Sequence, residues 1–283
     1  MTGDPRPLTS RPRGGDGSRI ELPDGLVLGG EEVVLIAGPC AVESEAQLLA
    51  AARGVSAAGA RMLRGGAFKP RTSPYAFQGL GDEALELLAR ARVDTGLPVV
   101  TEALDEQGVA RVARVADVIQ IGSRNMANGA LLRRAARAGR PVLLKRGMAA
   151  TLDELLHAAE YVMAEGNAQV LLCERGIRGF DGSTRYVFDL TAIPLLRQLT
   201  HLPIVADPSH ATGRSDLVPA MARAAIAAGA DALLLEVHPE PAHALSDGAQ
   251  SLDLAGFATL VDELRLVAEA IGRPLAVRSG SRR

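Results

Sequence analysis

The chain has almost no lysine. Its 283 residues include two lysines, Lys69 and Lys145, against 29 arginines (31 lysines plus arginines, less those two). Arginine serves as well as lysine on a solvated surface, but only the compact lysine amine changes its pKa readily when it is buried. We therefore expect both lysines to belong to a functional site, with chance survival of two lysines as the alternative.

Other scarce residues exclude whole classes of protein. Two cysteines, Cys40 and Cys173, are too few for a disulfide framework and favour a reducing cytoplasm. Tryptophan is absent and aromatic residues make up 3%, which argues against platforms that stack single-stranded nucleic acid. No apolar run is long enough for a membrane span, and the start lacks a signal-peptide pattern. A net charge of −2 creates no global attraction to nucleic acid or membrane. We expect a soluble, cytoplasmic globular protein.

From residue 33 onward the hydrophobic pattern alternates regularly. Short apolar runs typical of buried strands are each followed by a longer stretch with helical spacing. The expected strands are 33–38, 61–64, 98–101, 118–122, 141–145, 170–174, 203–206 and 232–237. The expected helices lie near 44–58, 82–95, 105–114, 127–138, 152–165, 191–199, 216–229 and 253–271. Eight such units predict a (β/α)8 TIM barrel. A doubly wound sheet is the alternative, but no GxGxxG follows the first strand.

The two ends differ from this pattern. Residues 1–18 are rich in Pro, Gly, Arg and Ser, and we expect them to form a disordered leader. Residues 19–30 predict a short N-terminal β-hairpin around a Pro-Asp-Gly turn. A single catalytic barrel should then span 31–275, with a flexible tail over 276–283.

Polar side chains follow every expected strand, where reactive groups of such a barrel are found. One group of them is cationic and consists of Arg64, Lys69, Arg71, Arg124, Lys145 and Arg175. So many like charges on one face repel one another unless anions bind between them, which predicts carboxylate or phosphate substrates. A merely solvated rim is the alternative, but Arg64 and Lys145 directly follow apolar strand residues.

A second group predicts a metal site. Cys40, His210, Glu236 and Asp247 offer a thiolate, an imidazole and two carboxylates, which suit a divalent metal ion such as Mn, Fe, Co or Zn. Their spacing matches no local zinc motif, so only the barrel would bring them together. For Cys40 alone, the alternative is a buried small apolar side chain.

Eight segments at these strand ends resemble a known family. They are IAGPCAVES, LRGGAFKPRTSPYAFQGLG, TEALD, QIGSRNMAN, PVLLKRGMAAT, LCERGIR, ADPSHATGR and EVHPEPAHALSDGAQSL. In this order they resemble 3-deoxy-D-arabino-heptulosonate 7-phosphate (DAHP) synthase, type I, beta subgroup. The resemblance implies a transferase that condenses phosphoenolpyruvate with erythrose 4-phosphate and water, giving DAHP and phosphate. This reaction is the first step of the shikimate pathway to the aromatic amino acids.

Carried over position by position, the resemblance implies three sets of site residues. Those that would bind phosphoenolpyruvate are Arg64, Lys69, Ser123, Arg124, Lys145 and Arg175. Those that would hold erythrose 4-phosphate are Pro70, Arg71, Thr72, Ser73 and Asp207. The metal ligands would be Cys40, His210, Glu236 and Asp247, and the catalytic residues would be Lys145, Glu102, Cys40 and His210.

The implied chemistry assigns different tasks to these groups. The metal ion would polarise the aldose carbonyl as a Lewis acid, and C3 of phosphoenolpyruvate would attack it. We expect Lys145 to transfer a proton to the aldose oxygen, a role that arginine cannot fill. Glu102 is the alternative group for activating or positioning the water, and the sequence leaves this choice open.

Rival interpretations remain at this stage. The related 3-deoxy-D-manno-octulosonate 8-phosphate synthase uses arabinose 5-phosphate, but it has KANRS-type and PAFL-type segments where this chain has KPRTS (69–73) and GSRN (122–125). Tyr186 stands where the pattern has an Asn-like residue, so the loop after the sixth strand is expected to differ. A Schiff-base aldolase with Lys145 as nucleophile would need no metal. The non-enzymatic rival is a sugar-phosphate-binding relic.

The resemblance also bears on organisation. Members of the beta subgroup often carry a fused regulatory domain, for which the segments outside the expected barrel are too short. We therefore expect no inhibition by aromatic amino acids through a domain of this chain. From the family we expect a homo-oligomer, either a dimer or a tetramer.

Overall fold

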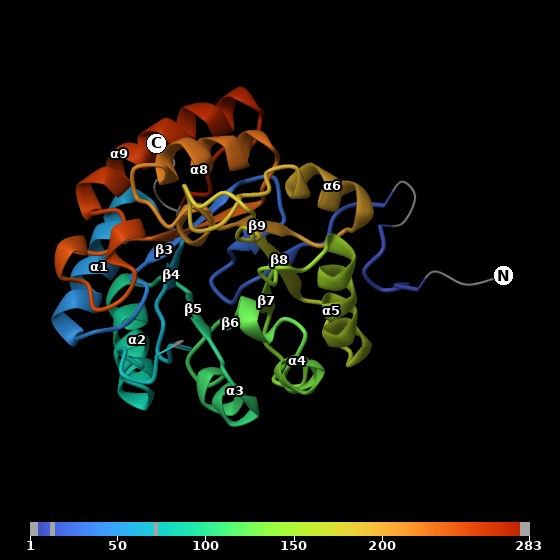
Figure 1. Cartoon of the computed structure of the whole chain (residues 1–283), viewed down its shortest axis with the longest axis horizontal. Coiled ribbons are helices and arrows are strands. Elements are labelled where there is room, and N and C mark those ends of the chain that lie inside the picture. Colours follow the sequence, from blue (N-terminus) through green and yellow to red (C-terminus); the bar gives the residue numbers. More distant parts are fainter. Residues whose placement is uncertain (1–4, 12–14, 71–72, 278–283) are drawn as a thin grey trace.

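Eight parallel strands form a closed barrel (Figure 1) in a computed structural model that describes residues 5–11, 15–70 and 73–277. The strands are β3 (Val34–Gly38), β4 (Met62–Arg64), β5 (Val99–Glu102), β6 (Val118–Ile121), β7 (Val142–Lys145), β8 (Val170–Glu174), β9 (Ile204–Ala206) and β10 (Ala232–Glu236). Each strand pairs with the next along the chain, and β10 pairs with β3 from Ala232 opposite Val34 onward. This closure confirms the expected barrel and excludes the open doubly wound sheet.

Helices surround the barrel in the order that the sequence predicts (Figure 1). They are α1 (Glu45–Ala58), α2 (Asp82–Thr95), α3 (Glu106–Val112), α4 (Gly129–Ala136), α5 (Leu152–Ala164), α6 (Ala192–Leu199), α8 (Val218–Ala227) and α9 (Leu254–Ala270). A short helix that the sequence analysis missed, α7 (Pro208–Thr212), follows β9. Three 3-10 turns are η1 (Ser123–Asn125), η2 (Pro241–His243) and η3 (Gly248–Gln250). Among the described residues, α7 adds the one full α-helical element that we did not expect.

Alternating strand residues divide the apolar core in two. In β3, Leu35 belongs to the cluster between the strands and the helices, whereas Val34 and Ile36 belong to the cluster inside the barrel. Successive side chains of a strand point to opposite faces, so an uninterrupted apolar run supplies both clusters. The strands are thereby held rigidly, and the polar residues that follow them start from fixed positions.

The expected N-terminal hairpin is present as β1 (Ile20–Glu21) and β2 (Val27–Leu28), which pair antiparallel. The side chains of Ile20 and Leu28 are buried in the same cluster as Val34, inside the barrel. Because Val34 begins its strand, the hairpin covers the end of the barrel where the strands start. The opposite end is left for the functional site.

The expectation of a disordered leader is wrong for residues 5–11. Thr9 is fully buried, and the backbone amides of Leu8 and Thr9 donate to the Glu160 carboxylate of α5 at 2.9 and 2.8 Å. Ser10 forms a bridge with Thr200. Composition did not reveal this contact because the partners come from distant helices. Residues 1–4, 12–14 and most of the expected tail (278–283) lie outside the described residues.

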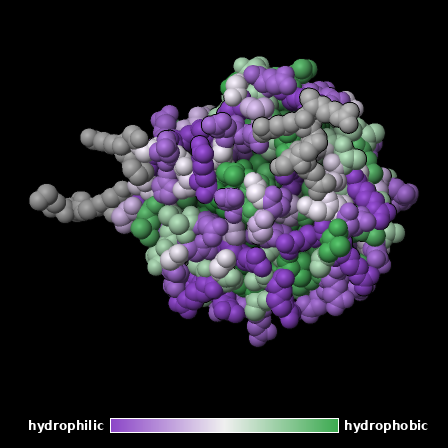
Figure 2. All heavy atoms as spheres, turned by 180° about the vertical axis from the view of Figure 1, so that it is seen from behind, coloured by the Kyte–Doolittle hydropathy of each residue, from purple (hydrophilic) through white to green (hydrophobic). Residues whose placement is uncertain are grey.

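The outer surface is of mixed polarity. Within the described ranges, no helix has the length and apolar character that a membrane crossing requires. Figure 2 shows hydrophilic side chains spread over the face opposite to that of Figure 1, with smaller hydrophobic areas between them.

Candidate active site

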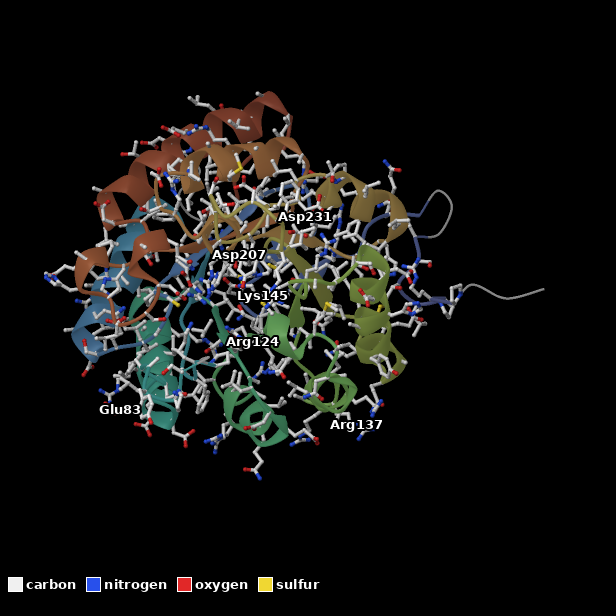
Figure 3. All side chains as sticks on the ribbon, in the orientation of Figure 1. Glu83, Arg124, Arg137, Lys145, Asp207 and Asp231 are labelled. Carbon is white, nitrogen blue, oxygen red and sulfur yellow. The ribbon has the colours of Figure 1, made fainter. Side chains whose placement is uncertain are left out.

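A cavity of about 270 Å³ lies at the carboxyl ends of the strands. The expected site residues that line it are Arg64, Lys69, Pro70, Ser73, Glu102, Ser123, Arg124, Lys145, Arg175, His210 and Asp247. Figure 3 shows Arg124, Lys145 and Asp207 toward the centre of the ribbon, whereas Glu83 and Arg137 lie on the outer helices. Arg71 and Thr72, expected at the aldose, lie outside the described residues.

The four predicted metal ligands come together. One donor atom from each of Cys40, His210, Glu236 and Asp247 lies within 4.8 Å of the others. Cys40 follows β3 and Glu236 ends β10, so the closure of the barrel places them side by side. His210 lies on α7, and Asp247 has a left-handed backbone (φ 55°) in the loop after β10. The cluster therefore depends on the tertiary fold and not on a local motif.

The protonation of these donors favours a cation. Burial lowers the pKa of His210, so its ring is neutral and keeps a free lone pair. Burial opposes ionisation of Asp247, but its hydrogen bond with Cys40 and the nearby His210 and Lys69 lower its pKa to about 2. Burial and Glu236 raise the pKa of the Cys40 thiol to about 12, so this ligand must release a proton when a cation binds. The donor set fits a divalent ion.

Neighbouring groups orient Glu236. Arg64 Nη1 donates to its Oε1 at 2.8 Å, and Gln250 Nε2 donates to its Oε2 at 2.6 Å. The Ser209 hydroxyl accepts the backbone N–H of Glu236 at 3.0 Å. Burial alone would raise the pKa of Glu236, but contacts with His210 and Arg64 lower it, so the carboxylate is ionised. Ligands held in this way by a second layer of hydrogen bonds need little reorganisation to bind a cation.

Asp207 joins the lysine and the histidine of the site. Its Oδ2 forms an ion pair with Lys145 Nζ and lies 2.7 Å from His210 Nδ1. When Asp207 accepts a hydrogen bond from Nδ1–H of His210, the other ring nitrogen, Nε2, carries the lone pair. This Nε2 lies 3.3 Å from Glu236 Oε1. We expected Asp207 beside the aldose, and that contact stays a prediction because the carboxylate is buried against these two partners.

The cationic side of the cavity has unused donors. Arg64 and Arg175 are almost fully buried, yet the Nε of each has no hydrogen-bond partner in the described part of the chain. A buried N–H without an acceptor is costly, so these groups indicate that an anion belongs in the cavity. Glu102 also lines the cavity, and its Oε2 accepts from Gln120 Nε2 at 3.2 Å.

The cavity is also lined by residues that were not expected from the sequence, and Tyr186 and Arg185 are two of them. Tyr186, noted only as a departure from the family pattern, lies under Arg175, whose Cζ is 4.2 Å from the ring centroid. Burial alone would raise the pKa of the Tyr186 phenol, but the guanidinium groups of Arg175 and Arg185 lower it. Arg185 donates to Gln250 Oε1 at 2.9 Å and lies 3.5 Å from Asp247 Oδ1. Neither residue directly follows a strand, so a search for polar residues at the strand ends did not find them.

Arg146 turns away from the cavity although it follows Lys145 directly. Its Nη1 donates to Glu174 Oε2 at 2.8 Å and to Asp189 Oδ2 at 2.9 Å. Glu174 Oε1 in turn accepts the backbone N–H of Gly176 at 2.7 Å. This buried network fixes the loop after β8 at both ends.

Comparisons with known proteins show the family of the chain. A sequence profile of the DAHP synthetase I family matches residues 19–271. Phospho-2-dehydro-3-deoxyheptonate aldolase of Thermotoga maritima is 50% identical over 268 residues, which cover 95% of this chain and 79% of that protein. A 2-dehydro-3-deoxyphosphooctonate aldolase of Koribacter versatilis is 33% identical over 270 residues, covering 88% of this chain and 96% of that protein.

Solved structures of such an enzyme also match this chain. The crystal structure of the Thermotoga maritima enzyme superposes with a TM-score of 0.93 at 48% identity and covers 96% of this chain and 79% of that one. A truncated form of the 3-deoxy-D-arabino-heptulosonate 7-phosphate synthase from Thermotoga maritima has a TM-score of 0.89 at 45% identity. The match covers 96% of this chain and 99% of that one.

Proposed function

The chain belongs to the DAHP synthetase I family, and from this premise we propose that it condenses phosphoenolpyruvate with erythrose 4-phosphate and water to give DAHP and phosphate. The observation that carries the proposal is one cavity that combines buried cations with a four-donor cluster. Arg64 and Arg175, whose Nε groups have no partner among the described residues, line it together with His210 and Asp247 of the cluster, and Arg64 hydrogen-bonds to Glu236 of the same cluster.

Phosphoenolpyruvate supplies the anions that the cationic side requires. We assign its phosphate and carboxylate to Arg64, Lys69, Arg124, Lys145 and Arg175, with Ser123 beside them. Charged donors held in place before the reaction stabilise the charge that develops on the substrate without further reorganisation. Erythrose 4-phosphate is assigned to the segment of residues 70–73, of which Pro70 and Ser73 line the cavity.

Cys40, His210, Glu236 and Asp247 would hold a divalent ion of the Mn, Fe, Co or Zn type, because the set mixes sulfur, nitrogen and oxygen donors. An ion bound there supplies Lewis-acid polarisation of the aldose carbonyl. The contacts of Asp207 keep the His210 ring in the orientation and tautomer that this binding needs.

Lys145 is assigned as the group that gives a proton to the aldose oxygen. Its ammonium is buried at the cavity wall and is held by Asp207, so its position is fixed before the substrates bind. As the bond between C3 of phosphoenolpyruvate and the aldehyde carbon forms, this oxygen becomes a hydroxyl. Water then adds at C2, and phosphate leaves by cleavage of its C–O bond. Glu102, which also lines the cavity, is the candidate for positioning or activating the water.

The two rival enzymes are less well supported. The relatives named 2-dehydro-3-deoxyphosphooctonate aldolase are 32–37% identical, against 50% for the heptonate enzyme. A Schiff-base aldolase needs a lysine amine that is free to attack a carbonyl, but Lys145 Nζ is held in an ion pair with Asp207.

We also propose that the protein is cytoplasmic and forms a homo-oligomer, a dimer or a tetramer. Val93 and Leu266 expose 87% and 69% of their surface, and subunit contacts over the outer helices would cover such side chains. Light scattering after size-exclusion chromatography tests this proposal, and a single monomeric species at micromolar concentration would refute it.

The deciding experiment measures phosphate release from phosphoenolpyruvate with erythrose 4-phosphate and with arabinose 5-phosphate, each with and without EDTA. We expect EDTA-sensitive release with the four-carbon sugar only. A preference for arabinose 5-phosphate would overturn the substrate assignment. Full activity in EDTA, in a sample that elemental analysis shows to be free of metal, would remove the metal from the mechanism.

A further inference from the structure

The loop between β8 and α6 carries Tyr186 over the cavity and is firmly anchored. The backbone amides of Arg185 and Tyr186 donate to the carbonyls of Thr212 and Ala211, which belong to α7, at 2.9 Å each. The next residue, Val187, exchanges two backbone hydrogen bonds with Ile177. The position of the tyrosine is therefore set by the backbone and does not depend on a bound substrate.

The ring of Tyr186 lies close to the guanidinium groups of two arginines. Cζ of Arg175 lies 4.2 Å from the ring centroid, and Cζ of Arg185 lies 5.7 Å from it. The phenol hydroxyl donates to Met148 Sδ at 3.3 Å. A Cβ added at Gly176 would lie 2.8 Å from the Cβ of Tyr186, so glycine permits the close approach of the ring to the strand end.

Arg175 has little else to orient it. Its Nη1 donates to the carbonyl of Gly176 at the long distance of 3.5 Å, and its Nε has no acceptor in the described ranges. Arg64, the other buried arginine of the cavity, is held by Pro39 and Glu236 at 2.9 and 2.8 Å. The aromatic ring, 4.2 Å from Cζ, is thus a fixed surface against which the Arg175 guanidinium can be aligned.

We propose that Tyr186 is a positioning residue, whose ring face aligns the guanidinium of Arg175 so that its free N–H groups meet phosphoenolpyruvate. The inference rests on the proposed function for the identity of the anion. Arg185, anchored to Gln250 and next to Asp247, is the second guanidinium near the ring. We assign the alignment chiefly to the ring face, although the phenol oxygen also hydrogen-bonds to Arg175 and Arg185.

Two substitutions of Tyr186 distinguish the contribution of its ring from that of its hydroxyl. Tyr186→Leu should raise the KM for phosphoenolpyruvate about tenfold, equivalent to about 1.4 kcal/mol, with kcat within roughly threefold of wild type. Tyr186→Phe should stay within about twofold in both constants, because it keeps the ring face. The matched control is Tyr161→Leu, which removes the contact with Arg133 (5.6 Å) on the outer helices and should leave the KM unchanged.

A double-mutant cycle tests whether Tyr186 acts through Arg175. In an Arg175→Ala background, Tyr186→Leu should weaken phosphoenolpyruvate binding by less than about twofold, because the partner of the ring is gone. Full additivity of the two changes, or an unchanged KM in Tyr186→Leu, would overturn the inference. If Tyr186→Leu does not fold, Tyr186→Met takes its place in the cycle.

Calorimetric titration of each variant with phosphoenolpyruvate alone measures binding without catalysis. The test of Tyr186 therefore does not depend on the proposed function. A wild-type protein that binds phosphoenolpyruvate but does not condense it would refute the proposed function, while the cycle would still report on Tyr186. If the wild type is active and the substitution Tyr186→Leu leaves phosphoenolpyruvate binding unchanged, only the present inference is refuted.

Discussion

Replacing Arg146 with methionine should destabilise the protein by about 3–5 kcal/mol, although this side chain does not line the cavity. Arg146 bridges Glu174 and Asp189 at 2.8 and 2.9 Å, and the side chains of Arg146 and Glu174 are 6% and 0% exposed. Removal of the guanidinium leaves a fully buried carboxylate without its cation. At roughly 2–4 °C per kcal/mol, the melting temperature should fall by about 6–20 °C.

The size of this effect should depend on pH. Burial raises the pKa of Glu174 even though Arg146 lowers it, so loss of Arg146 should raise that pKa further. The folded chain then keeps a proton on Glu174 that the unfolded chain releases above its ordinary pKa of about 4.3. Stability consequently falls as pH rises from that value through the raised folded pKa. Arg146→Met should be closer to wild type at about pH 5 than at about pH 8.

Urea unfolding at both pH values, followed by circular dichroism, measures the difference in the free energy of unfolding. Arg146→Met/Glu174→Gln should recover part of the loss, because no ionised group is then left alone. Arg137→Met is the matched control: it breaks an exposed pair with Glu165 and should cost little. Wild-type stability of Arg146→Met at the higher pH, or a deficit that does not change with pH, would refute the reasoning.

Three further predictions concern activity. Lys145→Arg should lower kcat by about 10²–10⁴-fold with little change in the KM for phosphoenolpyruvate, and near-wild-type phosphate release would contradict its acid–base role. Cys40→Ser should bind a divalent metal at least about tenfold more weakly in direct titrations while the fold is kept, and an unchanged metal affinity would remove Cys40 from the ligands. Gly122→Ala places a Cβ 2.0 Å from Glu102 Oε1, so it should displace this carboxylate and lower kcat about tenfold or more without loss of stability. Activity equal to wild type would show that the position of Glu102 is unimportant.

The barrel was predictable because its strands are buried on both faces. An uninterrupted apolar run such as 170–174 marks a strand of this kind, and the observed β8 has the same bounds. That the predicted metal ligands lie close together could be predicted from the closure of the barrel. Cys40 and Glu236 are far apart in sequence, but strands that close a barrel must meet at their carboxyl ends.

What the sequence did not predict depends on contacts between distant segments. The five residues of α7 are too few for a helical period to be recognised. Arg146 follows a residue of the cavity but turns to Glu174, because successive side chains at a strand end point to opposite sides. Thr9 lies in a leader of polar composition, and its place is explained by hydrogen bonds with Glu160 and Thr200, which are distant in sequence.

The scarcity of lysine now has a structural explanation. Both lysines line the same cavity and are buried, and each amine is in contact with a side chain of the metal cluster or its support. Lys69 Nζ lies 2.9 Å from Cys40 Sγ, and Lys145 Nζ pairs with Asp207. A planar guanidinium is larger than an ammonium and cannot be deprotonated at neutral pH, so it is a poor substitute at such contacts. In a chain that uses arginine on its surface, a retained lysine therefore marks a position where a compact amine is needed, and two of them locate the cavity before any motif is considered.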